Sequence, residues 1–145
     1  MPIRPDLASL TTWGFAFPGP LRDELTALAL AGTKTTTAGL LVEYEIEGAA
    51  VPTAGQREVL VDSNDQPVAV VETVSARIAR LADVDDEHAI DEGEGYADAA
   101  AFRVAHERHW NGYIDELRTA LHDPGFALDD DTLVVLERFR IVERL

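Results

Sequence analysis

The sequence contains no cysteine, a single lysine and no long run of apolar residues, and each of these absences excludes something. Without cysteine there are no disulfides, thiolate nucleophiles or zinc-cysteine sites, which agrees with a reducing compartment. No segment reaches the length of a membrane span, and the N-terminal stretch lacks the apolar core of a signal peptide. We therefore expect a cytoplasmic protein that folds as one domain over residues 1–145, a length sufficient to bury a core.

Positive charge is also scarce, because 12 basic residues face 27 acidic ones and the formal net charge is -15. Affinity for a nucleic-acid backbone comes largely from cations that release counterions from phosphates. We therefore expect no binding to duplex DNA or to a membrane, and a small ligand is easier to accommodate than a long polyanion. The sequence leaves open whether some arginines converge into a local basic groove, and it does not give the oligomeric state.

The single lysine is Lys34, which lies in the small polar run 31–37 after an apolar helical stretch. One explanation is that it interacts with the C-terminus of that helix, where the macrodipole favours a cation. The other is chemical, because a lysine can be tuned to lose its proton near neutral pH and an arginine cannot. Both explanations stay open at this point.

Apolar spacing and turn residues predict a mixture of helices and strands without an internal repeat. Residues 1–19 suit an irregular segment, Pro20 suits a first helical position and Gly32 suits the end of that helix. A helix is also favoured after Leu40, although alternation over 42–46 would suit a strand. In chain order, further elements are expected as a hairpin of 58–62 with 68–80, an acidic helix over 86–91, a long helix over 98–122 and a strand over 133–142.

Several patterns of known chemistry fail on their spacing. The run around Lys34 lacks the glycines of a phosphate-binding P-loop and follows a helix where a strand is required. The turn 63–67 lacks the spacing of a calcium-binding EF-hand loop. His106 and His109 share a helix face and, with Glu92 and Glu94, offer a metal site, but they do not match the zincin spacing, and packed histidines explain them better. We expect no metal and no cofactor.

Lys34, Thr37 and Glu72 form the favoured catalytic combination. Glu72 interrupts an apolar strand and needs a partner if it is buried, because an unpaired buried carboxylate is costly. Lys34 would supply that partner, and an amine held by a carboxylate can take the proton of a neighbouring hydroxyl. The alternative is that Glu72 faces water on an edge strand, since strand faces alternate.

At these residues the sequence resembles the ASCH-domain family over nearly its whole length. The family pattern glycine-x-lysine-x-x-threonine is present at 32–37 and is the most specific part of the match. Further matching segments are 41–45, Pro52 with Gly55, the 62–72 hairpin, 92–95, Phe102-Arg103-x-x-His106 and 137–139.

This resemblance implies an α+β, PUA-like fold, a small curled β-barrel with flanking helices and a cleft for a nucleoside or an RNA base. Some similar proteins are amidohydrolases that remove the acyl group of N4-acetylcytidine, and others have been described as ribonucleases. The implied roles are Thr37 as nucleophile, Lys34 as proton acceptor and Glu72 as the residue that orients Lys34 or relays a proton. The expected substrate-binding residues are Gly32, Thr35, Trp13 and Glu94.

Two other functions compete with the hydrolase. The first is a module or ribonuclease for single-stranded RNA, in which Trp13 stacks on a base and local arginines hold phosphate. The second is a protein-interaction domain with an inactive cleft. The chain also departs from the compact amidohydrolases by its greater length, by Tyr96 after the second loop glycine and by Phe102 where tryptophan is usual, so fold carries over more safely than activity.

Overall fold

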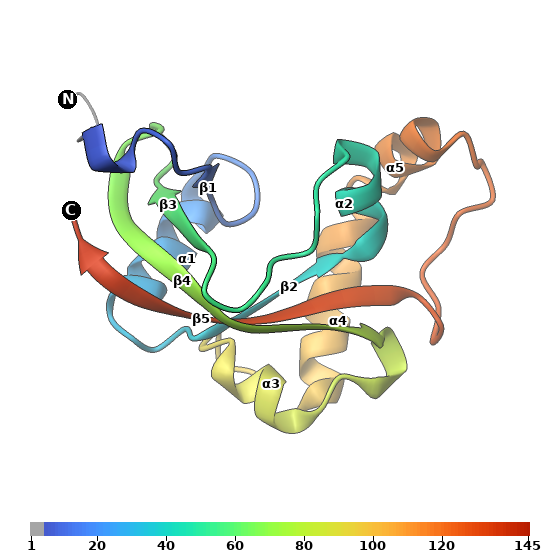
Figure 1. Ribbon diagram of the computed structural model, residues 1–145. Helices are drawn as coiled ribbons and strands as arrows, with labels where there is room; N and C mark the ends of the chain where they lie inside the picture. Colours follow the sequence, from blue (N-terminus) through green and yellow to red (C-terminus); the bar gives the residue numbers. More distant parts are fainter. Residues whose placement is uncertain (1–4) are drawn as a thin grey trace.

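The computed structural model describes residues 5–145, and its strands form one mixed, five-stranded sheet in the order β1-β3-β4-β5-β2 (Figure 1). β1 pairs in parallel with β3, and every other neighbouring pair is antiparallel. The strands are β1 (Thr12–Trp13), β2 (Thr36–Leu40), β3 (Arg57–Val61), β4 (Pro67–Arg80) and β5 (Leu133–Arg144). The predicted hairpin and final strand are thus confirmed as β3 with β4 and as β5.

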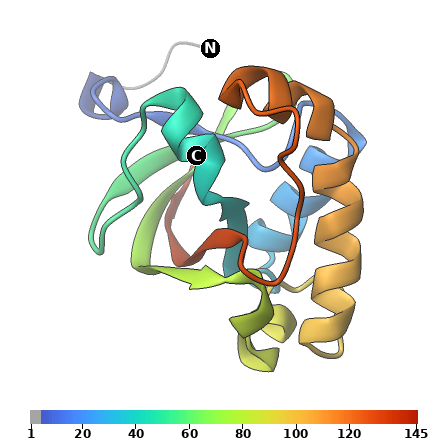
Figure 2. The same cartoon turned by 90° about the vertical axis from the view of Figure 1, so that its right-hand side faces the viewer.

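Five α-helices and two short 3-10 turns accompany the sheet in this part of the chain. The α-helices are α1 (Pro20–Leu30), α2 (Leu41–Glu47), α3 (Asp86–Asp91), α4 (Ala99–Asn111) and α5 (Ile114–Leu121), and the 3-10 turns are η1 (Pro5–Leu7) and η2 (Leu81–Asp83). In Figure 2, α4 stands along one side of the curved strands and α5 lies at one end of α4. None of the helices over residues 5–145 has the length and apolarity to span a membrane.

The two long strands β4 and β5 connect the halves of the molecule, as Figure 1 shows. One end of β5 contributes Val134 and Leu136 to a core cluster with α3, α4 and α5. Further along β5, Phe139 joins a second cluster, which includes Phe15 from the N-terminal segment and Leu25 from α1. Register shifts in the β4–β5 pairing bend the strands between these clusters, because a bulge increases local twist.

The expected long helix over 98–122 is wrong as one element, since the chain breaks between α4 and α5. Gly112 and Tyr113 separate the two helices, and Tyr113 leaves helical geometry at φ -132° and ψ 27°. Asn111 and Gly112 are both poor helix formers, so an amphipathic pattern that continues through them does not hold the helix together. The second helix also ends before Pro124, because His122 takes a left-handed conformation at φ 53°.

The expected small barrel is not confirmed. β1 and β2 are the two outer strands and do not pair with each other, so hydrogen bonding leaves the described sheet open. What the structure supports is an α+β architecture with a strongly curved mixed sheet. Of the segment 1–19 that we expected to be irregular, residues 1–4 lie outside the described part and the remainder holds η1 and β1.

The end of α1 sets the position of Lys34. Gly32 adopts φ 80°, the Gly32 amide donates to the Ala29 carbonyl and the Thr33 amide donates to the Leu28 carbonyl. These two bonds form a Schellman motif, which needs a residue with positive φ. The helix therefore ends at Leu30, four residues before Lys34, and β2 begins two residues after Lys34, at Thr36.

Candidate functional site

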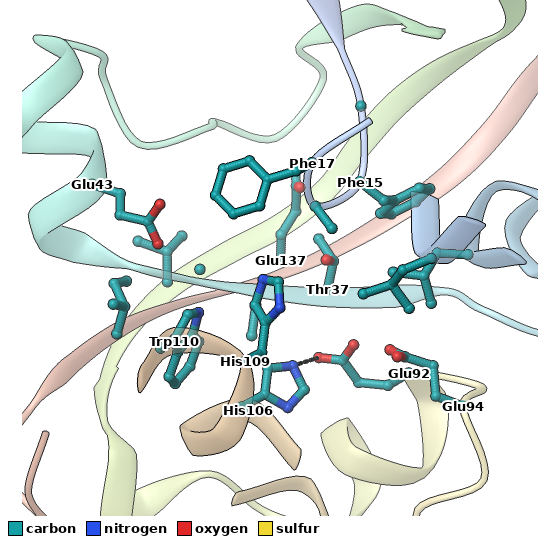
Figure 3. A pocket seen from close by; sticks show the side chains of 18 of the residues that line it. Phe15, Phe17, Thr37, Glu43, Glu92, Glu94, His106, His109, Trp110 and Glu137 are labelled. Atoms are coloured by element: carbon teal, nitrogen blue, oxygen red, sulfur yellow. Dashed lines mark ion pairs between the residues drawn. The ribbon is translucent and has the colours of Figure 1, made fainter. Parts of the chain in front are cut away.

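A pocket of about 500 Å³ opens between the N-terminal loop, β2, α2 and α4 (Figure 3). Trp13 comes from the end of β1, Gly14 to Phe17 come from the N-terminal loop that follows it, and Thr37 to Leu40 come from β2. Further lining is Leu21, Leu25, Lys34, Glu43, Tyr44, Glu47, Glu92, Glu94, Tyr96, Ala105, His106, His109, Trp110, Tyr113, Val135 and Glu137. The glycine-x-lysine-x-x-threonine segment predicted from the sequence thus reaches the pocket through Lys34 and Thr37.

Lys34 is held in the pocket wall by four oxygen atoms. Its Nζ donates to Glu92 Oε2 at 2.6 Å, to Glu94 Oε2 at 2.9 Å, to the Thr36 carbonyl at 2.9 Å and to the Glu92 carbonyl at 3.3 Å. Only 2% of Lys34 and 1% of Glu92 are exposed. Since an ammonium has three N–H groups, these acceptors already use its whole donor capacity. Lys34 is therefore a fixed donor that positions two carboxylates.

Glu92 lies at the centre of a buried charge network. Its Oε1 accepts from His88 Nε2 at 3.1 Å and lies 3.8 Å from His106 Nε2, the pair marked by the dashed line in Figure 3. Burial by itself would raise the pKa of Glu92, but the His88 hydrogen bond and the Lys34 charge outweigh it and lower that pKa to about 2. The carboxylate is thus ionised throughout the neutral range.

His106 is fixed in one orientation by α4. Its Nδ1 donates to the Phe102 carbonyl at 2.9 Å, and its ring stacks on Phe102 with centroids 3.8 Å apart. Burial lowers the pKa of His106 despite the neighbouring Glu92 charge. The contact with the Phe102 carbonyl thus directs Nδ1 at the backbone and leaves Nε2 on the side of Glu92.

Gly93 allows the turn with Glu92 and Glu94 to reach Lys34. It adopts φ 71°, and a Cβ added there would lie 2.4 Å from the Thr33 carbonyl oxygen and 2.8 Å from Lys34 Cα. Any larger residue would push the two backbones apart, because the obstructing atoms belong to the main chain. The close approach explains how one short turn delivers two carboxylates to one ammonium.

Thr37 and Glu137 face the pocket from neighbouring strands. They are directly opposite each other in the β2–β5 register, so their side chains lie on the same face of the sheet. Glu137 Oε1 accepts from the Thr73 hydroxyl at 2.8 Å. Burial nevertheless raises the pKa of Glu137 above its ordinary value. Figure 3 shows Thr37 and Glu137 behind the middle of the pocket, with Glu92 and Glu94 below Thr37.

The expected contact between Lys34 and Glu72 is wrong. Glu72 lies on β4 and pairs with Arg57 at 3.1 Å and with Arg140 at 2.6 Å, and it is not part of the pocket lining. Its neighbours on β3 and β5 are these same arginines, so the register alone explains the pairing. Glu92 and Glu94 take the place predicted for Glu72. A catalytic role for Glu72 stays a prediction without a supporting contact.

The expected substrate-binding residues divide into two groups. Trp13 and Glu94 line the pocket. Gly32 and Thr35 do not line it: Gly32 ends α1, and the Thr35 amide donates to the Asp91 carbonyl at 2.9 Å. Their contribution is to hold the segment that presents Lys34 and Thr37.

The pocket is acidic and aromatic. Among residues 5–145, its lining includes five glutamates and one lysine but no arginine. Burial raises the pKa of Glu94 despite the Lys34 charge, and it raises the pKa of Glu43 despite a hydrogen bond from the Tyr113 hydroxyl at 2.8 Å. Burial likewise raises the pKa of Tyr44 to about 12. The glutamates offer many hydrogen-bond acceptors and repel a phosphate, and the tyrosine hydroxyls stay protonated and can donate.

The residues that sequence reasoning missed are Glu92 as the partner of Lys34, Glu137 beside Thr37, and His88. Glu92 and Glu94 did stand out as carboxylates flanking a glycine, but a partner 58 residues away from Lys34 has no local signal.

The metal hypothesis for His106 and His109 finds no support: across residues 5–145, no group of three or more histidine or acidic side chains is arranged to hold a metal ion.

Comparison with known proteins agrees with the resemblance seen in the sequence. The family model described as ASCH domain matches residues 11–143. The crystal structure of protein EF3133 from Enterococcus faecalis V583, assigned to the family model DUF984, has a TM-score of 0.78 and 24% identity, over 92% of this chain and 77% of that chain. The ASCH domain structure from Lactobacillus crispatus JV V101 has a TM-score of 0.78 and 25% identity, over 95% of this chain and 82% of that chain. Among curated proteins, none matches this sequence.

Proposed function

Because the chain belongs to the ASCH domain family, we propose that its pocket binds a nucleoside or an unpaired RNA base and hydrolyses an N-acyl group on it, as in N4-acetylcytidine. The observation that carries this proposal is that a hydroxyl and a positioned carboxylate line the same pocket. Thr37 lines the pocket together with Glu94, whose Oε2 is held 2.9 Å from Lys34 Nζ. A hydroxyl nucleophile with a nearby base is the general requirement for acyl transfer.

The charge of the lining favours a small uncharged substrate. Five glutamates against one lysine, whose N–H groups are already used, provide no site for a phosphate. A free nucleoside avoids this repulsion, whereas a polynucleotide must bring its backbone close to the acidic mouth. Amide and exocyclic amino groups are uncharged and find acceptors in the same carboxylates.

In the proposed reaction the Thr37 hydroxyl oxygen attacks the acyl carbon, and its proton passes to Glu94. The bond between the acyl carbon and the exocyclic nitrogen then breaks, the nitrogen takes the proton from Glu94, and the free amine leaves. A water molecule attacks the threonine ester, gives a proton to Glu94 and releases the carboxylic acid. Glu94 returns that proton to the Thr37 oxygen.

Lys34 acts in this scheme as a positioning residue. Its Nζ donates to oxygen atoms in all four of its contacts, so we assign it the holding of Glu94 and Glu92 in place of the proton-accepting role implied by the resemblance. Glu94 suits the base role because burial raises its pKa toward the working range of a general base. Its side chain, 17% exposed, also retains contact with the pocket opening.

Single-stranded RNA is the second candidate ligand, since the ASCH family is generally RNA-binding-like and aromatic rings line the pocket. In that case only one unpaired base enters the pocket, and the phosphates stay outside it. Steep loss of affinity for a short oligonucleotide with added salt would support this candidate. Affinity for cytidine that is independent of salt would support the nucleoside.

The test is release of cytidine from N4-acetylcytidine by the purified protein, followed by chromatography. Thr37→Val removes the hydroxyl and keeps the shape, and Glu94→Gln removes the base; both are expected to reduce kcat by at least about 100-fold. Glu72→Gln is the matched control on β4 and should retain wild-type activity. Activity that persists in Thr37→Val, or is lost in Glu72→Gln, would contradict this assignment, and a folded wild-type protein without turnover would reject the hydrolase.

A further inference from the structure

Two aromatic rings meet in the middle of the pocket. Phe17 enters from the N-terminal loop and His109 rises from α4, with ring centroids 6.1 Å apart and planes inclined by 37° (Figure 3). Tyr113 stands beside both of them in edge-on contacts, at 5.0 Å from Phe17 and 5.5 Å from His109. Phe17, His109 and Tyr113 thus form one aromatic group in the pocket lining.

Phe17 contributes little to the core of the protein. Its exposed fraction is 55%, and it belongs to none of the three clusters of buried apolar residues. Phe15, two residues earlier in the same loop, is buried against Phe139 and supplies the packing that holds the loop. A large exposed ring at a pocket is therefore free to serve a ligand.

The two rings are in contact with each other in this structure, so their spacing is slightly smaller than a stacking slot requires. A planar ring between two others needs about 3.5 Å on each side, or about 7 Å in total. The observed separation of 6.1 Å falls short by roughly 1 Å, and the planes are not yet parallel. Arg22 donates to the Phe15 and Ala16 carbonyls, and Ser63 is hydrogen-bonded to Gly19, so the backbone on both sides of Phe17 is held in place. The additional space therefore has to come from rotation of the Phe17 side chain, which is 55% exposed.

We propose that Phe17 and His109 are the two faces of a slot that clamps the planar heteroaromatic ring of the ligand, and that Glu43 and Glu137 accept hydrogen bonds at its edge. This inference rests on the proposed function in one respect, namely that the ring is the base of the nucleoside. Figure 3 places Glu43 to one side of the two rings and Glu137 behind them. Carboxylates at the edge favour a ring with an exocyclic amino group, as in cytosine or adenine, over one that offers only carbonyl acceptors there.

Binding is measured by quenching of tryptophan fluorescence, because Trp13 and Trp110, the only tryptophans of the chain, both line the pocket. The probes are cytidine, N4-acetylcytidine, adenosine, uridine and ribose. Base–aromatic stacking predicts that Phe17→Ala and Phe17→Leu weaken cytidine binding by roughly ten-fold, whereas Phe17→Tyr stays within about two-fold. His109→Ala should weaken it similarly, and ribose should not bind. Unchanged thermal unfolding of the Phe17 variants checks that the fold is intact.

The outcomes separate this inference from the hydrolase. Cytidine binding that depends on the Phe17 ring, without turnover of N4-acetylcytidine, supports the slot and rejects only the hydrolase. Turnover with the same KM in wild type and Phe17→Leu supports the hydrolase and overturns the slot. Equal affinity for ribose and cytidine, equal affinity in wild type and Phe17→Ala, or no quenching by any nucleoside would also overturn it.

Discussion

Replacement of Lys34 by methionine should strongly destabilise the fold. Methionine has a similar length and no charge, so it preserves the packing and removes the donor shared by four oxygens. Glu92, 1% exposed, then keeps only its histidine contacts in the interior. Loss of one partner of a buried ion pair costs about 3–5 kcal/mol, because the remaining charge is left without compensation.

That cost is a large part of the total stability of a typical domain, about 5–15 kcal/mol. For a chain of this size, a loss of about 3–5 kcal/mol should lower the melting temperature by roughly 6–20 °C. Urea unfolding, monitored by the fluorescence of Trp13 and Trp110, measures the same loss at equilibrium. As a matched control, Arg57→Met breaks the largely exposed pair with Glu72 and should barely change the unfolding midpoint.

A double variant tests whether the unpaired Glu92 charge causes the loss of stability. Lys34→Met combined with Glu92→Gln removes both charges, so it should recover at least half of the stability lost in Lys34→Met.

The pH dependence of the stability gives a further check of the ion pair. The pKa of Glu92 is lowered from 4.5 to about 2, so its stabilisation is complete above pH 4.5 and is lost as the pH falls toward 2. The deficit of Lys34→Met should therefore shrink over that range. A double variant no more stable than the single one would refute the argument.

Three further outcomes follow from the same geometry. The acid limb of kcat/KM for N4-acetylcytidine should have its midpoint above pH 4.5, because the pKa of Glu94 is raised by burial and the base must be ionised; a profile flat down to pH 4 would contradict this. Gly93→Ala should lower the melting temperature and impair turnover, since its Cβ meets the Thr33 carbonyl; wild-type values for both would show that the turn relaxes freely. Glu137→Gln should raise the melting temperature at pH 7.5, with the gain vanishing below pH 4.5, because burial raises the pKa of Glu137 and its ionised form opposes folding; an equal gain at pH 4 would point to packing instead.

Local patterns in the sequence were sufficient for most of the elements. Pro20 and Gly32 mark the two ends of the first helix correctly, and Gly48 ends the second in a left-handed conformation. These residues act through their own backbone preferences, so neighbours in the sequence determine the outcome. The same reasoning failed at Gly112, where the apolar spacing continued but the backbone did not, since periodicity reports which face is buried and not whether the chain is continuous.

Only part of the site could be predicted from the sequence, because its residues come from segments that lie far apart in the chain. Lys34 and Thr37 belong to one short segment, and its pattern of residue types is visible in the sequence. The partner of Lys34 depends on which distant carboxylate is brought to it, and apolar neighbours pointed to Glu72. The strand register instead places Glu72 between Arg57 and Arg140, and a tight backbone contact at Gly93 delivers Glu92. Both are long-range features that no local pattern contains.

The contact at Gly93 also bears on the order of events in folding. Lys34 and Glu92 are 58 residues apart, and the main chain at Gly93 approaches that of Thr33 and Lys34, so this contact requires α1, β2 and α3 to be packed together. Until that docking, both charges remain hydrated, and afterwards both are sealed from water in the same step that pairs them. The two charges therefore lose their water and gain their ion-pair partner in the same step. The chain does not pass through an intermediate with an unpaired charge buried in its interior. We therefore expect the functional site to be among the last parts of the molecule to form, so that refolding restores secondary structure before it restores ligand binding.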